Sequence, residues 1–400
     1  MRIGMMADLY KPHVSGVTNY IALNKRYLES EGHEVYVFTF GDEYYQEDEP
    51  NVIRSPGLPI SDTGMHFSLR YTREARRTLR TMDVAHVHHP FISGSIALRY
   101  CRADRTPIIF TNHTRYDLYA KAYLPFLVDM IGVAALKAYL LSFCRSCDLV
   151  VSPSAGMKDV LKDMGIDVPI DVVPNGVDIK PFLDPVEPLE RAEFGFQAQD
   201  VILVYMGRLG PEKNLSFLLR SFAGIAQAYD NVQLMLIGVG PTKADLQDLV
   251  KYMGIEGRVR FTGLVPYDQM PRYLAIGDAF VTASITEVHP LSVIEAMAAG
   301  LPVLGIDSPG IGDTIQDGVT GYLIPKEDLA AYTAQMVRLV VDQKQREQMS
   351  GEARKSVTSY AIENTTQMML ERYQRVIEDV SHRKRSLRYR LGHLFSGSQK

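Results

Sequence analysis

The stretch ITEVHPLSVIEAMAAGLPVLG, residues 285–305, holds a loop, a helix and a strand in direct succession. The run LSVIEAMAA has helical character, and Gly300 and Pro302 end it. The apolar run PVLGI that follows is typical of a buried strand. One glutamate, Glu287, lies in the loop, and a second, Glu295, lies in the helix. The stretch therefore predicts an α/β fold with carboxylates near a strand end.

The same alternation of short β-rich runs and helical patterns extends in both directions, which indicates parallel sheets covered on both faces. It restarts after PNGVD, residues 174–178, so we expect two Rossmann-like domains facing a cleft. The first is expected to span residues 1–178 and the second residues 179–360. Helical residues 328–380 are expected to finish the second domain or, over about 360–380, to return to the first. The Pro-rich stretch 181–190 is a candidate hinge. The predicted strands are RIGMMA, EVYVFTF, DVAHVHH, PIIFTNH, DLVVSPS and IDVVPNG, then VILVYMG, VQLMLIG, RVRFTG, DAFVTAS, PVLGI and GYLIP.

Composition places the chain among ordinary globular proteins, with 46% apolar and 22% charged residues in 400. Its 3 cysteines do not make a disulfide framework, which favours reduced thiols and a cytoplasmic location. The N-terminus reaches Asp8 before any signal-peptide core can form. The apolar region 124–143 contains Asp129 and Lys137, so a membrane-spanning helix is not expected.

The formal net charge of −4 conceals a basic C-terminal tail. Residues 381–400 contain six Lys or Arg and no acid, so the remainder is distinctly acidic. This asymmetry favours an anionic surface as a partner and gives no support to nucleic-acid binding.

Polar clusters follow several predicted strands, where open α/β sheets bind ligands. In GRLGPEKN, residues 207–214, Arg208 and Lys213 can reach a diphosphate from a strand-to-helix turn, although a solvated basic turn fits as well. His113, after PIIFT, can contact a substrate hydroxyl or serve as a structural histidine. Gly16 can let the backbone approach a ligand or simply form a turn.

Three histidines, His86, His88 and His89, lie close together in the sequence. Their spacing points His86 and His88 to the same side of a strand, but no acidic or cysteine ligand of suitable spacing accompanies them. A metal site is the weaker interpretation, and we expect none.

The two glutamates of the opening stretch can span a nucleotide sugar. Glu295 can accept hydrogen bonds from two ribose hydroxyls, and Glu287 can reach a sugar beyond the phosphates. Between them the helix N-terminus, near His289 to Ser292 and including Pro290 and Leu291, presents unpaired N–H groups to phosphate or sugar oxygens. Two solvated glutamates remain the alternative for this pair alone.

Taken together, these motifs resemble glycosyltransferase family 4, the retaining GT-B glycosyltransferases, from residue 1 to about 340. The glutamate pair followed by AMAAGLPV is highly specific when GRLGPEKN precedes it. The order PHVSGV, FTNHT and DLVVSPS looks like the diacylglycerol glucosyltransferase branch. Val-His-Pro stands after Glu287 where many family members have Gly-Phe-Gly, so the donor sugar is left open.

The resemblance implies that the domain at residues 1–178 binds the acceptor and that the domain at 179–360 binds the nucleotide sugar. It also implies a role for each matching residue. Arg208 and Lys213 would hold the donor diphosphate, and Glu295 the ribose. Glu287 and His113 would contact the sugar, and Gly16 would approach the phosphates or the acceptor. Leu264 and Val265 would contact the base through backbone groups.

The resemblance also implies the reaction: hexose transfer from a nucleotide-diphosphate sugar, UDP-sugar being expected, with retention and without a metal or other cofactor. The absence of an Asp-x-Asp pattern agrees with this. We expect a membrane lipid such as diacylglycerol as acceptor, and a peripheral location on the inner face of the cell membrane. Features that favour a lipid surface are helix 121–143, the arginines Arg70, Arg73, Arg77 and Arg80, and the basic tail. Alternatives are a soluble-acceptor or polysaccharide-precursor transferase of the same fold, and a non-catalytic nucleotide-binding scaffold.

Overall fold

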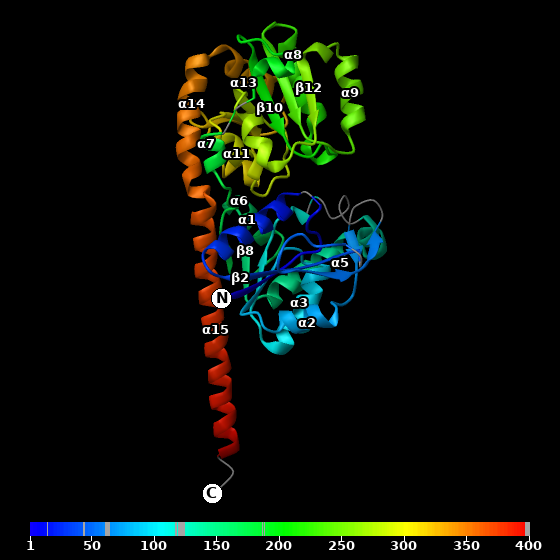
Figure 1. Ribbon diagram of the computed structural model, residues 1–400, viewed down its shortest axis with the longest axis vertical. Coiled ribbons are helices and arrows are strands. Elements are labelled where there is room, and N and C mark those ends of the chain that lie inside the picture. The colour runs from blue at the N-terminus through cyan, green and yellow to red at the C-terminus, as the bar shows by residue number, and fades with distance from the viewer. Residues whose placement is uncertain are drawn as a thin grey trace. The chain divides into compact units, whose positions relative to one another are not determined.

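The computed structural model describes residues 1–13, 15–42, 45–60, 65–116, 118, 125–185, 187 and 189–396, with backbone alone for 60, 65, 125–131, 133 and 384–396. The chain forms two compact units (Figure 1). Unit 1 comprises residues 1–153, 158–174 and 363–400, and unit 2 comprises residues 154–157 and 175–362. The Pro-rich stretch 181–190 thus lies inside unit 2 rather than at the crossing.

Unit 1 is built on a seven-stranded sheet whose strands are all parallel. Strand β1 lies between β2 and β6, so the chain reverses its direction of winding between β1 and β6. Across the sheet the strands are β3 (Val52–Pro56), β2 (Glu34–Gly41), β1 (Arg2–Met6), β6 (Val84–Val87), β7 (Ile108–Thr111), β8 (Leu149–Ser152) and β9 (Ile170–Val172).

Helices α1 (Gly16–Ser30) and α15 (Ile362–Ser396) cover one face of this sheet, because their apolar residues share a core with strand residues such as Ile3 and Val35. On the other face, α2 (Arg73–Leu79) and α5 (Pro125–Ser146) contribute Leu79 near Gly4 and Phe143 against Phe110. Helix α3 (Ile92–Asp104) packs on this face against α5 and against β1, β6 and β7. A separate antiparallel pair joins β4 (Leu58–Ile60) to β5 (Met65–Phe67).

Unit 2 is built on a six-stranded parallel sheet with the same winding, which reverses between β10 and β13. Across the sheet the strands are β12 (Val259–Gly263), β11 (Val232–Ile237), β10 (Val201–Met206), β13 (Ala279–Val281), β14 (Val303–Ile306) and β15 (Gly321–Ile324). Alternate residues of β10 enter two different cores: Leu203 lies in one and Ile202 in the other. The strands are therefore buried on both faces, as parallel sheets require.

Helices α8 (Leu215–Ala226), α9 (Lys243–Tyr252) and α13 (Leu329–Val341) cover one face of the unit 2 sheet. The other face carries α7 (Lys180–Leu183), α10 (Met270–Leu274), α11 (Leu291–Ala298) and α12 (Pro309–Gly312). Helix α14 (Gln343–Ser356) contributes to both cores, and α6 (Ala155–Asp163) begins in unit 2 and ends in unit 1.

The predicted Rossmann-like architecture is confirmed, and each predicted strand is present. Apart from the short excursion at residues 154–157, the chain passes from unit 1 to unit 2 after residue 174 and returns after residue 362. The segments next to these two points pair with each other. The Val177 N–H donates to the Tyr360 carbonyl at 2.9 Å, and the Ile362 N–H donates to the Val177 carbonyl at 2.9 Å. These bonds put the crossings near residues 174 and 362 rather than in the Pro-rich stretch.

The apolar region 124–143 forms part of α5, which is broken at Gly132 by non-helical dihedral angles. Beyond the break, Leu136 and Leu140 are buried and Lys137 is exposed. Residues 119–124 lie outside the described part of the chain. Within the described residues, no helix combines the length and the apolar character that crossing a bilayer requires.

Candidate active site

In unit 2 the predicted donor-binding residues follow the two strands at which the winding of the sheet reverses. Gly207 and Arg208 come directly after β10, and Glu287 lies in the loop after β13. The carboxyl ends of such neighbouring strands form the usual ligand site of an open α/β sheet. Both loops therefore belong to one candidate site.

Lys213, predicted to bind the donor diphosphate, and Glu287, predicted to bind the donor sugar, contact each other. The Lys213 Nζ donates to Glu287 Oε1 at 2.6 Å, and both side chains are largely buried. The hydroxyls of Ser284 and Thr286 donate to the Glu212 carbonyl at 3.4 and 3.3 Å. The loop after β10 is thus bonded to the loop after β13 by side chains from both.

Gly310, which the sequence analysis overlooked, supports the loop that carries Glu287. The Gly310 N–H donates to the Glu287 carbonyl at 3.0 Å. A Cβ at this position would stand 2.4 Å from the Val288 carbonyl carbon, so no other residue fits without moving that backbone. The sequence signal was the glycine in SPGIG after PVLGI, at another strand end.

Arg208 is more exposed than Lys213. Its Nη1 lies 3.9 Å from Glu212 Oε1, and its side chain is 55% exposed. The Tyr205 hydroxyl donates to the Arg208 carbonyl at 3.0 Å and fixes the backbone instead. The guanidinium is therefore accessible to a ligand.

Glu295 is almost wholly buried in α11, and its Oε1 accepts a 2.8 Å hydrogen bond from the Tyr267 hydroxyl. Burial raises the pKa of the Glu295 carboxyl to about 7, although this hydrogen bond acts in the opposite direction. Tyr267 closely follows Leu264 and Val265, the predicted base contacts; Leu264 is exposed and Val265 is buried. Tyr267, the first residue of the 3-10 helix Tyr267–Gln269, was overlooked because a single tyrosine carries no motif of its own.

His289 lies ahead of α11, but its side chain turns into the protein. The Asn175 N–H donates to His289 Nδ1 at 3.2 Å, and Asn175 Nδ2 donates to the His289 carbonyl at 2.9 Å. The ring also contacts Tyr360 edge-on. A donor contact predicted for His289 would therefore have to use its backbone. Pro290 and Leu291 form the start of α11, where the proline side chain has no acceptor to cap the helix.

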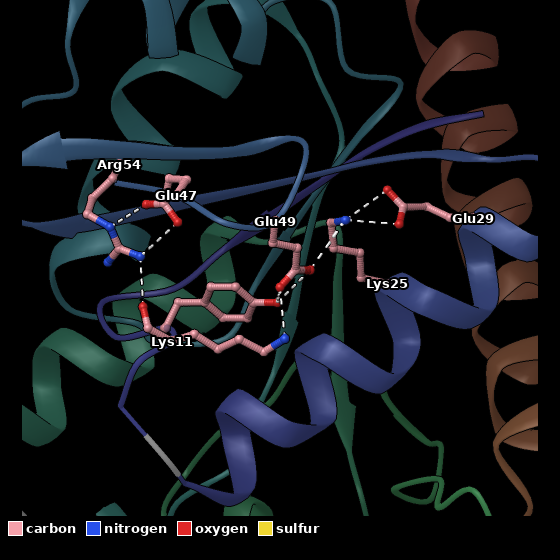
Figure 2. Close-up of polar contacts among 7 residues, drawn as sticks. Lys11, Lys25, Glu29, Glu47, Glu49 and Arg54 are labelled. Carbon is pink, nitrogen blue, oxygen red and sulfur yellow. Dashed lines mark hydrogen bonds and ion pairs between the residues drawn. The ribbon is translucent and has the colours of Figure 1, made fainter. Parts of the chain in front are cut away.

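In unit 1, Gly16 is the first residue of α1, and Ser15 caps the helix by accepting from the Thr18 N–H at 3.1 Å. The segment before it is tied to Glu49, which accepts from Lys11 Nζ at 2.8 Å and from the Tyr10 hydroxyl at 3.1 Å. Figure 2 shows the Glu49 carboxylate between Lys11 and Lys25. An added Cβ on Gly16 would meet nothing within 4 Å, so space remains open beside this glycine.

His113 follows β7 and is half-buried. Its Nε2 lies 3.0 Å from Nδ1 of His88, which follows β6. The turn that carries it is held by Asn112, whose Nδ2 donates to the Thr114 carbonyl at 3.0 Å. His86 and His88 do face the same side, with ring centroids 4.1 Å apart. Within the described residues, no three His, Cys, Asp or Glu side chains are grouped so as to hold a metal ion.

Comparison with known proteins identifies the family. Residues 14–180 match the family described as Glycosyltransferase Family 4, and residues 186–356 match Glycosyl transferases group 1. The alpha-monoglucosyldiacylglycerol synthase of Streptococcus pneumoniae is 30% identical over 340 residues, covering 82% of this chain and 77% of the synthase. The chain belongs to glycosyltransferase family 4. The synthase of the same name from Acholeplasma laidlawii is 28% identical over 345 residues, covering 82% of this chain and 86% of that enzyme.

Other relatives of this glycosyltransferase have different names. A GDP-mannose-dependent alpha-mannosyltransferase of Corynebacterium glutamicum is 25% identical over 388 residues, covering 94% of this chain and 89% of that enzyme. Among solved structures, Anabaena HepE in complex with UDP and glucose has a TM-score of 0.73 at 18% identity, covering 94% of this chain and 99% of HepE. Sucrose-phosphate synthase from Thermosynechococcus elongatus has a TM-score of 0.77 at 19% identity, covering 94% and 99%. These structures confirm the predicted GT-B fold.

Proposed function

We propose that this glycosyltransferase moves a hexose from a UDP-sugar to a hydroxyl of a membrane lipid such as diacylglycerol, with retention and without a metal. The Lys213–Glu287 pair carries the proposal, because it sets a cation beside a carboxylate at the reversal point of the unit 2 sheet. A nucleotide sugar has a matching sequence of groups: anionic diphosphate, then sugar hydroxyls. The names of the two synthases support the lipid acceptor.

Each proposed contact follows from the chemistry of its side chain. Lys213 and Arg208 bind the diphosphate, and Glu287 accepts hydrogen bonds from the sugar hydroxyls once Lys213 has turned to the phosphates. Glu295 binds the ribose, and the backbone at Leu264 and Val265 borders the base. His113 and Gly16 serve the sugar and the acceptor.

The proposed reaction is a same-face displacement. The acceptor oxygen bonds to the anomeric carbon as the bond from that carbon to the diphosphate oxygen breaks. The departing oxygen takes the acceptor's proton, and Lys213 and Arg208 stabilise the charge that develops on it. No carboxylate nucleophile is assigned, so no covalent glycosyl–enzyme intermediate is part of the proposal.

Exposed groups of unit 1 support the lipid surface. Leu58 and Leu69 are 74% and 72% exposed, and Phe67 is also exposed, close in the sequence to the predicted basic stripe. Apolar side chains beside cations suit an anionic membrane interface. The four arginines predicted for this surface, all exposed, are Arg70, Arg73, Arg77 and Arg80, the last of which is paired with Asp104.

The decisive experiment compares Lys213→Ala with Glu287→Ala. Lys213→Ala is expected to weaken UDP binding by about tenfold or more, because a charge-assisted contact is lost. Glu287→Ala is expected to leave UDP binding equal or tighter, because it removes the carboxylate that competes with the diphosphate for Lys213, yet to abolish transfer. Calorimetry with UDP and product analysis by mass, using UDP-glucose and diacylglycerol, measure the two effects.

Lys355→Ala is the matched control, since Lys355 pairs with Glu352 at 2.8 Å on the exposed surface of α14. Near-normal turnover in both site variants would refute the assignments. If the wild-type protein transfers hexose only to sugars, the soluble-acceptor alternative holds. If it binds UDP tightly but neither hydrolyses nor transfers any nucleotide sugar, the scaffold alternative holds.

A further inference from the structure

Unit 1 contains a buried chain of ring contacts that ends at His113. Tyr373 of α15 contacts His86 Nδ1 at 2.6 Å, and Thr111 contacts His86 Nε2 at 2.7 Å. The His86 ring packs on the ring of His88, whose Nδ1 meets His113 Nε2 at 3.0 Å. The chain thus runs from a core helix to a residue at the carboxyl end of β7.

His88 is enclosed and cannot reach a ligand. Its exposed fraction is 0%, and the Tyr20 ring meets it edge-on at 5.6 Å. Its Nε2 is buried and has no hydrogen-bond partner among the described residues. Any effect of His88 on the reaction must therefore act through His113.

Both rings of the His88–His113 pair are neutral. Burial lowers the pKa of His88 well below its usual range, and the neighbouring histidines lower it further. The same causes lower the pKa of His113. One proton is therefore available for the shared hydrogen bond, and it resides on one of two nitrogens.

The unpaired Nε2 of His88 indicates which of the two bonded nitrogens, His88 Nδ1 or His113 Nε2, carries the shared proton. If His113 donated, His88 would have to carry its own proton on Nε2, where a buried N–H would have no acceptor. Unpaired buried N–H groups are rarer than unpaired acceptors. We infer that His88 donates from Nδ1 to His113 Nε2, so that His113 is held as the tautomer protonated on Nδ1. His88 is then a positioning residue.

This assignment defines what His113 offers to a substrate: a fixed N–H donor from Nδ1, aimed by the bond to His88. A donor suits a hydroxyl or carbonyl oxygen of the hexose and does not suit removal of a proton from the acceptor. The inference rests on the proposed function only for the identity of that oxygen.

The test exchanges His88 for asparagine or leucine. Asparagine Nδ2 takes the place of histidine Nδ1 and can donate, whereas leucine has a similar shape and cannot. His88→Asn is expected to keep kcat within about threefold, and His88→Leu to lower it about tenfold, as for loss of one oriented hydrogen bond. UDP affinity should change less than about twofold in both, because no unit 2 donor contact is altered. His33→Leu, elsewhere in unit 1, controls for loss of a histidine ring.

Equal losses in both His88 variants, or normal kcat in His88→Leu, would overturn the inference. A second readout needs no turnover: NMR of protein labelled with ¹⁵N-histidine, with the His113 signal assigned by its disappearance in His113→Leu. Protonation at Nδ1 is expected, and protonation at Nε2 would overturn the inference even in an active enzyme. Protonation at Nδ1 in a protein that transfers no sugar would instead refute the proposed function.

Discussion

Glu295 holds its carboxyl group where ionisation is costly, with a pKa raised to about 7 by burial. Between pH 4.5 and about 7 the folded chain keeps a proton that the unfolded chain has released. The unfolded state binds fewer protons in this window, so stability falls as the pH rises through it. A carboxylate kept at such a position suggests a ligand that benefits from the charge.

Glu295→Gln is therefore expected to stabilise the protein at pH 8 and not at pH 4.5. Glutamine still accepts from the Tyr267 hydroxyl but cannot ionise. The gain at pH 8 is up to about 3 kcal/mol, the equivalent of the raised pKa. Denaturant unfolding at the two pH values measures it, with Glu352→Gln, on the exposed surface, as the control.

UDP binding to the same variant tests the role in ribose binding. In the wild type, ionisation of Glu295 should raise the affinity for UDP about tenfold from pH 6 to pH 8. Ionisation of the UDP phosphates adds its own change to this. The phosphate contribution is removed by comparing wild type and variant at each pH. An identical pH profile in both would show that Glu295 does not contact the nucleotide.

At the scale of single residues, sequence predicted the side chains that follow strands but not the partners that fix them. Lys213 and Glu287 are predicted as ligand contacts because their residue types and strand-end positions match a ligand's charges, and the structure brings the two side chains together. Tyr267, Gly310 and His88 act on a predicted residue through space, from another strand's loop. Sequence separation hides such pairs, and His88 was interpreted only as a weak metal ligand.

Among the elements, the segment that leads into α1 depends on one carboxylate. Glu49 accepts from Tyr10 and Lys11 and lies 3.3 Å from Nζ of Lys25, a lysine 2% exposed (Figure 2). Burial alone would raise the pKa of Glu49, but Lys11 and Lys25 together lower it. The lowered pKa stabilises the fold above about pH 4.5, and this contribution is lost as the pH falls through the lowered value.

Glu49→Gln is expected to destabilise unit 1 by about 2 kcal/mol at pH 7, because the buried Lys25 loses one of the two carboxylates, Glu29 and Glu49, with which it pairs among the described residues. The difference from wild type should shrink in acid, where Glu49 is itself protonated. Unfolding at pH 7 and pH 3 measures both effects. Glu34→Gln, which breaks an exposed pair with Arg2, is the control, and equal destabilisation by the two substitutions would contradict this role of Glu49.

The element pattern was largely predictable because apolar periodicity identifies strands buried on both faces. Strands β3, β4 and β5 were not predicted, since β4 and β5 have 3 residues each and Pro56, Gly57 and Pro59 interrupt the segment. Helix α15 also continues past Ser381, where a separate tail was expected. The Lys and Arg residues of this segment are good helix formers, so their presence is as compatible with a helix as with a solvated tail.

At the scale of the whole molecule, helix α15 near the C-terminus packs into the core formed by the first strand and helix of the chain. Met369, Leu370, Tyr373 and Val376 of α15 lie in the core that β1 and α1 form. Burying four such side chains contributes about 6–12 kcal/mol. That is comparable with the entire stability of a typical domain, so unit 1 depends on residues that follow unit 2 in the chain.

Two truncations separate this structural role from the proposed membrane role. A chain ending at Ile362 is expected to lose cooperative unfolding of unit 1. A chain ending at Ser381 keeps every one of the four core side chains and loses the exposed Arg383–Asp148 pair, which is worth less than about 1 kcal/mol. Its Tm should therefore fall by no more than about 4 °C.

The chain that ends at Ser381 also loses six basic residues. Each contributes about 1 kcal/mol near an anionic surface, so co-sedimentation with phosphatidylglycerol vesicles should weaken at least about tenfold. Unchanged binding at low salt would remove the tail from the membrane site and leave the arginines at 70–80 to carry it.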